Sequence, residues 1–179
     1  MSNETHIGEL IAEITNAFDR VARADGTTLH EAIAIDDWKT REEQLAARRL
    51  DTEQRWQDIP DDVIVACESA LPFLDTKGFR YYLPAFMVCG LRNWENDAGR
   101  VVDTCEYNLL HERQKSLRQS DPASIAAKYG LTDAQCKAIA HFLRFVVGND
   151  DDELTTQPAT TLQAVAKWER FAGDRVSLT

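Results

Sequence analysis

Apolar residues recur every three or four positions along most of the chain, which is the spacing of an amphipathic helix. Two stripes are the clearest, and they run through Ile7, Leu10, Ile11, Ile14, Phe18 and Val21, and through Cys136, Ile139, Ala140, Leu143, Val146 and Val147. The pattern predicts an all-α or predominantly α fold. Because 179 residues suit one compact unit, we expect a multi-helix single domain over residues 1–179.

Polar residues at fixed offsets mark where helices begin. Thr28 with Glu31, Thr40 with Glu43, and Thr132 with Gln135 each form a capping-box pattern. Pro60 and the pair Asp121-Pro122 fit the first turn of two further helices. We therefore expect helices to start just after these positions.

Two segments interrupt the helical pattern. Asp75 to Gly78 predicts a tight turn, and residues 79–83 are expected to be extended because Leu83 precedes Pro84, so the fold should contain a short extended turn segment near residues 75–83. Residues 149–158 carry an acidic run followed by threonines and a proline, which predicts a mobile acidic loop.

The charge of the chain narrows the class of partner. Thirty acidic and twenty basic residues give a net charge of −10, which repels phosphate backbones and attracts basic surfaces. We therefore expect a basic protein partner and no nucleic acid. The predicted contact residues are Asp36, Asp37, Asp58, Asp61, Asp62, Asp150, Asp151, Asp152 and Glu153.

The cysteines and the amino terminus indicate a cytoplasmic protein. Cys67, Cys89, Cys105 and Cys136 lie inside apolar helical patterns without a C-x-x-C pair, so they are expected to be buried, reduced thiols. The first residues lack a signal-peptide pattern, and the longest apolar run is too short to span a membrane.

No recognised catalytic or metal-binding motif is present. His30-Glu31 has Ala34 where a zinc-protease helix needs a second histidine, and the acidic run has Leu154 where a calcium loop needs glycine. No serine occupies a nucleophile elbow. We therefore predict no catalytic residue, no metal and no cofactor.

Two other sites are considered. Asp75, Arg80, Tyr81 and Tyr82 place a carboxylate, a guanidinium and hydroxyls near one turn, which suits a small polar ligand or acid–base chemistry. The same residues would also serve as anchors and locks of the turn. Residues 125–139 carry the small residues and the glycine of a helix-turn-helix, although Gln135 and Lys137 are its only base- or phosphate-contacting candidates.

Three motifs together resemble a bacterial family of small cytosolic proteins of unknown function. The central motif is Phe73-Leu74-Asp75 followed by Gly78-Phe79-Arg80-Tyr81-Tyr82-Leu83-Pro84-Ala85-Phe86-Met87. It is flanked by Asp36-Asp37-Trp38 with Trp56, and by Leu131-Thr132-x-x-Gln135 with Phe142-Leu143. The resemblance implies a bacterial, cytosolic origin and brings no activity or catalytic residues.

The sequence thus favours a non-enzymatic acidic interaction protein, with an immunity-type protein that neutralises a basic bacterial toxin as its most concrete form. A small-molecule binder or enzyme using Asp75, Arg80 and Tyr81 is the first alternative. A DNA-binding helix-turn-helix at residues 125–139 is the second.

Overall fold

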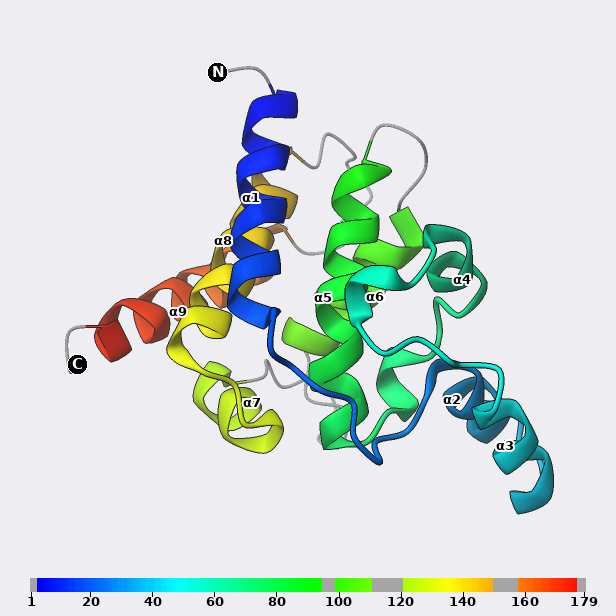
Figure 1. Ribbon diagram of the computed structural model, residues 1–179. Coiled ribbons are helices and arrows are strands. Elements are labelled where there is room, and N and C mark those ends of the chain that lie inside the picture. The colour runs from blue at the N-terminus through cyan, green and yellow to red at the C-terminus, as the bar shows by residue number, and fades with distance from the viewer. Residues whose placement is uncertain (1–2, 95–98, 111–120, 150–157, 177–179) are drawn as a thin grey trace. The chain divides into compact units, whose positions relative to one another are not determined.

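The computed structural model describes residues 3–94, 99–110, 121–149 and 158–176, and these ranges contain helices and no strand (Figure 1). The α-helices are α1 (Asn3–Phe18), α2 (Leu29–Asp36), α3 (Arg41–Arg48), α4 (Asp61–Ala66), α5 (Thr76–Arg92), α6 (Gly99–Leu110), α7 (Pro122–Tyr129), α8 (Asp133–Asn149) and α9 (Pro158–Val176). Two 3₁₀-helices are η1 (Trp56–Asp58) and η2 (Leu71–Phe73). The predicted α-helical fold class is confirmed. No helix within these ranges is long and apolar enough to cross a membrane.

The chain divides into two units, which are described separately. Unit 1 holds Met1–Ala17 and Glu106–Thr179, and unit 2 holds Phe18–Cys105. The single domain expected over residues 1–179 stays a prediction. The acidic loop predicted at 149–158 falls, apart from its first and last residues, outside the described ranges, and so do Asp150, Asp151, Asp152 and Glu153.

In unit 1, α1 lies antiparallel to α8. Near the start of α1, the His6 ring meets Phe145 edge-on, with ring centroids 5.6 Å apart. In the second half of α1, Glu13 pairs with His141. Near the end of α1, the Ala17 carbonyl accepts a hydrogen bond from Gln135. The contacts run forward along α1 and backward along α8, so the two predicted apolar stripes face a common core.

Helix α9 completes unit 1 through a buried tryptophan. Trp168 is 1% exposed, and its indole Nε1 donates to the Leu109 carbonyl at 3.1 Å. Packing α9 against α8 buries Ala164, Val165 and Ala172 as well. A large side chain whose one polar atom is satisfied anchors the helix firmly.

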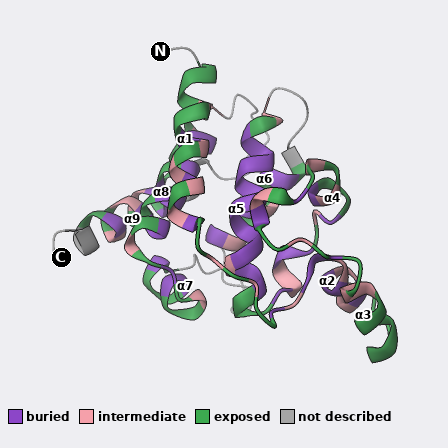
Figure 2. Cartoon of the chain, viewed as in Figure 1, coloured by how far each residue is buried: buried purple, intermediate pink, exposed green. Residues whose placement is uncertain are grey.

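In unit 2, α5 is the central helix. Every residue from Tyr81 to Leu91 is buried, so the ribbon of α5 is purple on all sides in Figure 2. Within the unit it contacts α4, η1 and η2. A helix that is apolar all round lies inside a core, so the sequence FRYYLPAFMVCGL is the strongest core signal of the chain.

The extended turn predicted near residues 75–83 is wrong. Only Leu74 and Asp75 have extended backbone, and a continuous helix begins at Thr76 and includes Pro84. Asp75 caps the helix by accepting the Gly78 amide at 2.7 Å. Proline in a helix interior costs about 3 kcal/mol, whereas each large apolar side chain that is buried contributes about 1.5–3 kcal/mol. Burial of the many large side chains of α5 therefore outweighs the proline.

Several local predictions are confirmed. Thr28 with Glu31 and Thr40 with Glu43 form complete capping boxes, and Thr132 exchanges the equivalent hydrogen bonds with Gln135. All four cysteines are free and buried. Burial raises the pKa of Cys67 and of Cys89 to about 11, which keeps these thiols protonated at neutral pH.

Gly78 lies where the loop before α2 crosses the start of α5. A Cβ at this position would overlap the Thr27 carbonyl oxygen and lie 3.1 Å from the capping oxygen of Asp75. Because backbone cannot move aside cheaply, Gly78→Ala should lower the free energy of unfolding by about 1–3 kcal/mol in urea denaturation. Gly8→Ala is the matched control, since nothing lies within 4 Å of that Cβ and alanine favours a helix. An equal effect of both substitutions would contradict this account.

Candidate functional site

A partly buried polar cluster lies beside the first half of α5. The guanidinium of Arg23 donates to Glu53 at 2.8 Å and to the Tyr82 hydroxyl at 2.7 Å. Tyr82 in turn donates to Glu53 at 2.7 Å. Arg23 also donates to the Asp51 carbonyl, and its guanidinium carbon lies 5.8 Å from the centre of the Tyr81 ring. The cluster joins the loops on both sides of α2 and α3 to the central helix.

Burial governs the protonation of this cluster. Burial and the hydrogen bond to Glu53 raise the pKa of Tyr82 far above its ordinary value, and burial raises the pKa of Tyr81 to about 12. Burial alone would lower the pKa of Arg23, but the bond to Tyr82 and the charge of Glu53 outweigh it, so the pKa is raised. The cluster is therefore an ion pair with a neutral tyrosine, and neither tyrosine can act as a base near neutral pH.

The raised tyrosine pKa values predict how stability changes in alkali. Because the folded pKa of Tyr81 exceeds the unfolded value of about 10, its contribution is complete below that pH and is lost as the pH rises toward about 12. A spectrophotometric titration should show tyrosinate absorbance that appears only at this high pH or together with unfolding. Tyr81→Phe should remove part of that late absorbance. Late absorbance that is unchanged in Tyr81→Phe would contradict the assignment.

The residues predicted to form a small-molecule site do not share one open surface. Tyr81 and Tyr82 are fully buried, and the Tyr81 hydroxyl has no hydrogen-bond partner among the described residues. Asp75 is exposed and accepts hydrogen bonds from the backbone amides of Gly78 and Thr27, while Arg80 is half-buried. This packed arrangement favours a structural role, in which Asp75 caps α5 and the tyrosines anchor it.

The described acidic candidates differ in whether their carboxylates are already bonded to other side chains. Asp61 pairs with Arg92 at 3.2 Å and accepts from Asn93, and Asp36 accepts a hydrogen bond from Ser69 at 3.5 Å. Asp37, Asp58 and Asp62 are exposed. The described carboxylates therefore lie on several elements, and the pair Asp36 and Asp37 directly precedes Trp38, whose side chain is 93% exposed.

Helix α3 is attached to unit 2 through its polar side. The carboxylate of Glu31, a residue that is 3% exposed, accepts hydrogen bonds from Arg48 at 2.6 Å and from Arg41 at 3.0 Å. No residue of α3 is buried, and in Figure 2 the helix is green and pink along its whole length. Leu45 and Leu50 are 41% and 64% exposed. Helix α3 is thus held by ion pairs and not by a buried apolar face, while Leu45 and, just after the helix, Leu50 stay exposed.

Trp38, in the turn between α2 and α3, is the most exposed of the large hydrophobic side chains among the described residues. It is 93% exposed and has a left-handed backbone with φ 56°. The Trp38 amide donates to the Ile35 carbonyl and the Lys39 amide to the Ala34 carbonyl, which is the Schellman motif at a helix end. Glycine is the usual residue at this position, so neither local conformation nor burial explains a tryptophan here.

The predicted helix-turn-helix segment adopts two helices with a turn between them. Gly130 is left-handed between α7 and α8. Gln135 is 4% exposed and bonds Thr132 and the Ala17 carbonyl, so it is not available to a base edge. Lys137 is exposed, but farther along the same face His141 pairs with Glu13 and Arg144 with Glu169. The positive charges of this face are largely neutralised by carboxylates.

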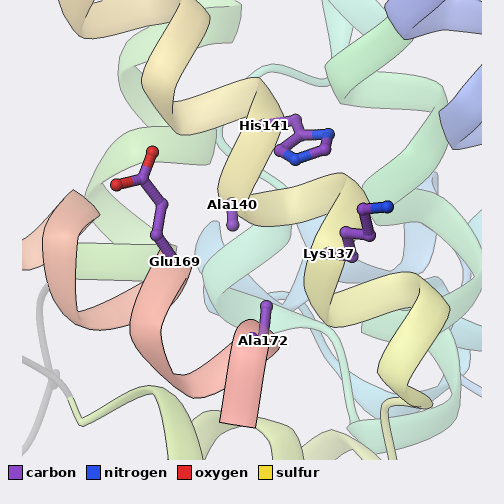
Figure 3. Close-up of a pocket in the computed structure, with 6 residues that line it drawn as sticks. Lys137, Ala140, His141, Glu169 and Ala172 are labelled. Carbon is purple, nitrogen blue, oxygen red and sulfur yellow. The ribbon is translucent and has the colours of Figure 1, made fainter. Parts of the chain in front are cut away.

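A pocket of about 370 Å³ lies between α8 and α9 in unit 1. In Figure 3 the side chains of Lys137 and His141 extend from α8, Glu169 extends from α9, and Ala140 and Ala172 line the space between the helices. Glu169 is bound to Arg144 and His141 to Glu13, so two of the three charged or titratable side chains that line the pocket are engaged elsewhere. No set of three potential metal ligands converges here or anywhere else among the described residues.

Sequence reasoning did not identify three features of this region. The Arg23 to Tyr82 bond joins residues 59 apart, and no local pattern predicts such a pair. The role of Glu31 beyond its capping box was missed, although two arginines at the ends of one short helix were a signal. Trp38 was noted only as part of a motif, although a tryptophan just after a helix of apolar residues is unusual.

These observations define a helical protein without strands in its described part. Its clearest exposed feature is the hairpin formed by α2, the turn at Trp38 and α3. The chain belongs to a family of unknown function, DUF6714, whose model matches residues 6–170. No curated protein and no solved structure matches the chain significantly. The family assignment agrees with the predicted membership of an uncharacterised family.

Proposed function

We propose that this protein is a non-enzymatic interaction protein that binds a basic protein partner in the cytoplasm. Its most concrete form is an immunity-type protein that neutralises a basic bacterial toxin. The net charge of −10 supports a basic partner because opposite charges steer association and penalise wrong partners.

The observation that carries the proposal is helix α3, which lies on the surface of unit 2 without burying a residue. A helix of eight residues is too short to be stable alone, and helices of this size are normally retained because they bury an apolar face. Helix α3 buries no residue and leaves Leu45 exposed, and Trp38 before it and Leu50 after it are exposed as well. Exposed apolar side chains bordered by charges are typical of surfaces that bind another protein.

An enzymatic role has less support. Tyr81 and Tyr82 are buried and protonated, Asp75 caps a helix, and the cysteine thiols are protonated as well. These residues therefore offer no exposed nucleophile or base, and in the pocket between α8 and α9 His141 and Glu169 are bonded to Glu13 and Arg144.

Affinity capture of proteins from the native host, followed by identification, tests the proposal. We expect a basic protein that binds the natural chain and is lost when the exposed carboxylates Asp37, Asp58 and Asp62 are together replaced by lysine. The complex should also weaken with rising salt. A captured partner that is acidic, or binding that is indifferent to this charge reversal, would overturn the proposal.

A further inference from the structure

We propose that the turn from Asp36 to Trp38 is a docking site for an arginine or lysine side chain of the basic partner. This inference rests on the proposed function and assigns its contact point. The site is defined by the indole face of Trp38 together with the carboxylates of Asp36 and Asp37, and it is called the Trp38 turn below.

The first argument is the exposed indole. Trp38 is 93% exposed, whereas Trp56 and Trp168 are 3% and 1% exposed and use their indole nitrogens in the core. Tryptophan has the strongest cation-binding ring face of the aromatic side chains. It is also the residue type most enriched among those that dominate binding energy at protein interfaces. The Schellman turn holds its backbone in a single conformation, which reduces the ordering that binding would require.

The second argument is the charge around this indole. Helix α2 ends at Asp36, is capped by Asp37 and has no basic residue in its last turn, and the exposed Lys39, after Trp38, offsets only one of these two negative charges. A helix carboxyl end carries partial negative charge, so two carboxylates there reinforce it rather than offset it. Local stability would favour lysine or arginine at these positions. The arrangement costs stability in the free protein, and a cation placed against the turn would relieve that cost.

The third argument concerns what fits the site. An ammonium or guanidinium group can contact an aromatic face and a neighbouring carboxylate together, and guanidinium stacks especially well because it is planar. A phosphate group would be repelled by the same carboxylates, so nucleic acid does not fit. Ser69 bonds Asp36 from the side of η2, which limits how far that carboxylate can turn away.

Titration with a synthetic arginine-rich peptide, followed by NMR of the tryptophan indole N–H signals, tests the inference. The comparison probe is a glutamate-rich peptide of equal length. The Trp38 signal is assigned by its loss in Trp38→Gly, a variant that should keep or raise the melting temperature because glycine suits the left-handed turn. We expect the arginine-rich peptide, and not the glutamate-rich peptide, to shift the Trp38 signal. Trp38→Gly should weaken binding of the arginine-rich peptide at least about tenfold.

A matched pair of charge variants separates the site from general electrostatics. Asp36→Asn with Asp37→Asn removes two negative charges at the turn, and Glu4→Gln with Glu9→Gln removes two from exposed positions of α1. We expect about tenfold weaker binding for the first pair and less than about threefold for the second.

The outcomes distinguish the inference from the proposed function. Equal weakening by both pairs, or weakening only by Asp58→Asn with Asp62→Asn, would overturn the docking site and leave the basic partner in place. Absence of binding by any basic peptide at low salt would contradict both. Sedimentation that shows the natural chain as a dimer and Trp38→Gly as a monomer would assign the turn to a second copy, which also overturns the inference.

Discussion

Glu31→Ala is expected to lower the free energy of unfolding by about 3–5 kcal/mol. The substitution removes two charge-assisted hydrogen bonds to a buried carboxylate, one from Arg48, whose side chain is 29% exposed, and one from Arg41, whose side chain is 66% exposed. The same substitution removes the capping box at the start of α2. Urea denaturation measures the loss, and limited proteolysis should cut within residues 39–50 earlier than in the natural chain.

A comparison with α3 separates the ion pairs from the capping box. Glu43 has the same position in the capping box of α3, but it is exposed and bonds only Thr40 in the structure. We expect Glu43→Ala to cost much less than Glu31→Ala, and Glu31→Gln to fall between them. Equal losses for Glu31→Ala and Glu43→Ala would mean that the two arginines do not hold α3.

The same pairs predict an acid dependence. Burial alone would raise the pKa of Glu31, but hydrogen bonds from Arg48 and Arg41 outweigh it, so the pKa is lowered. A lowered folded pKa means that the contribution of Glu31 is complete above the unfolded value of about 4.3 and is lost as the pH falls through the folded value. The stability difference between the natural chain and Glu31→Gln should therefore be constant near neutral pH and shrink below about pH 4.

Arg23→Met is also expected to lower the free energy of unfolding by about 3–5 kcal/mol. It removes the donor to both Glu53 and Tyr82 and leaves the Glu53 carboxylate, whose side chain is 15% exposed, without its cation. Methionine retains much of the length and apolar contact of the arginine stem, so the loss reports mainly the charge and the hydrogen bonds. Denaturation in urea should show a lower midpoint with an unchanged slope.

A double-mutant cycle tests this interpretation. Glu53→Gln removes the charge that Arg23 compensates, while its amide oxygen can still accept from Tyr82. The double variant Arg23→Met with Glu53→Gln should therefore lose less than the sum of the two single variants, by about 0.5–3 kcal/mol. Strict additivity would show that the two charges are not coupled in the folded protein. Arg49→Met, at an exposed position of the same unit, should change stability little.

Elements set by local chemistry could be predicted from the sequence. The capping boxes at Thr28 and Thr40 formed as expected because each needs only residues three positions apart. The first half of helix α5, before Pro84, was not predicted, since the rule for Pro84 is local while the burial that overrides it comes from the rest of unit 2. Amino-acid preference at one position is a weak constraint against a dozen buried side chains.

The candidate sites show the same limit. Aromatic and charged residues from Asp75 to Tyr82 are close in sequence, but the polar partners of Tyr82 are 29 and 59 residues away, so the sequence did not reveal that the hydroxyl is buried. Which side of α3 faces α2 could not be predicted either. That choice is fixed by the ion pairs of Glu31, and these join residues 10 and 17 positions apart.

The central claim is that the hairpin of α2 and α3 is the surface that binds a basic partner. Amide hydrogen exchange of the natural chain, compared with and without its captured partner, measures this most directly. The account predicts that protection increases in residues 36–50 and changes little in α8 and α9. Protection that increases on α8 while residues 36–50 exchange as before would contradict it.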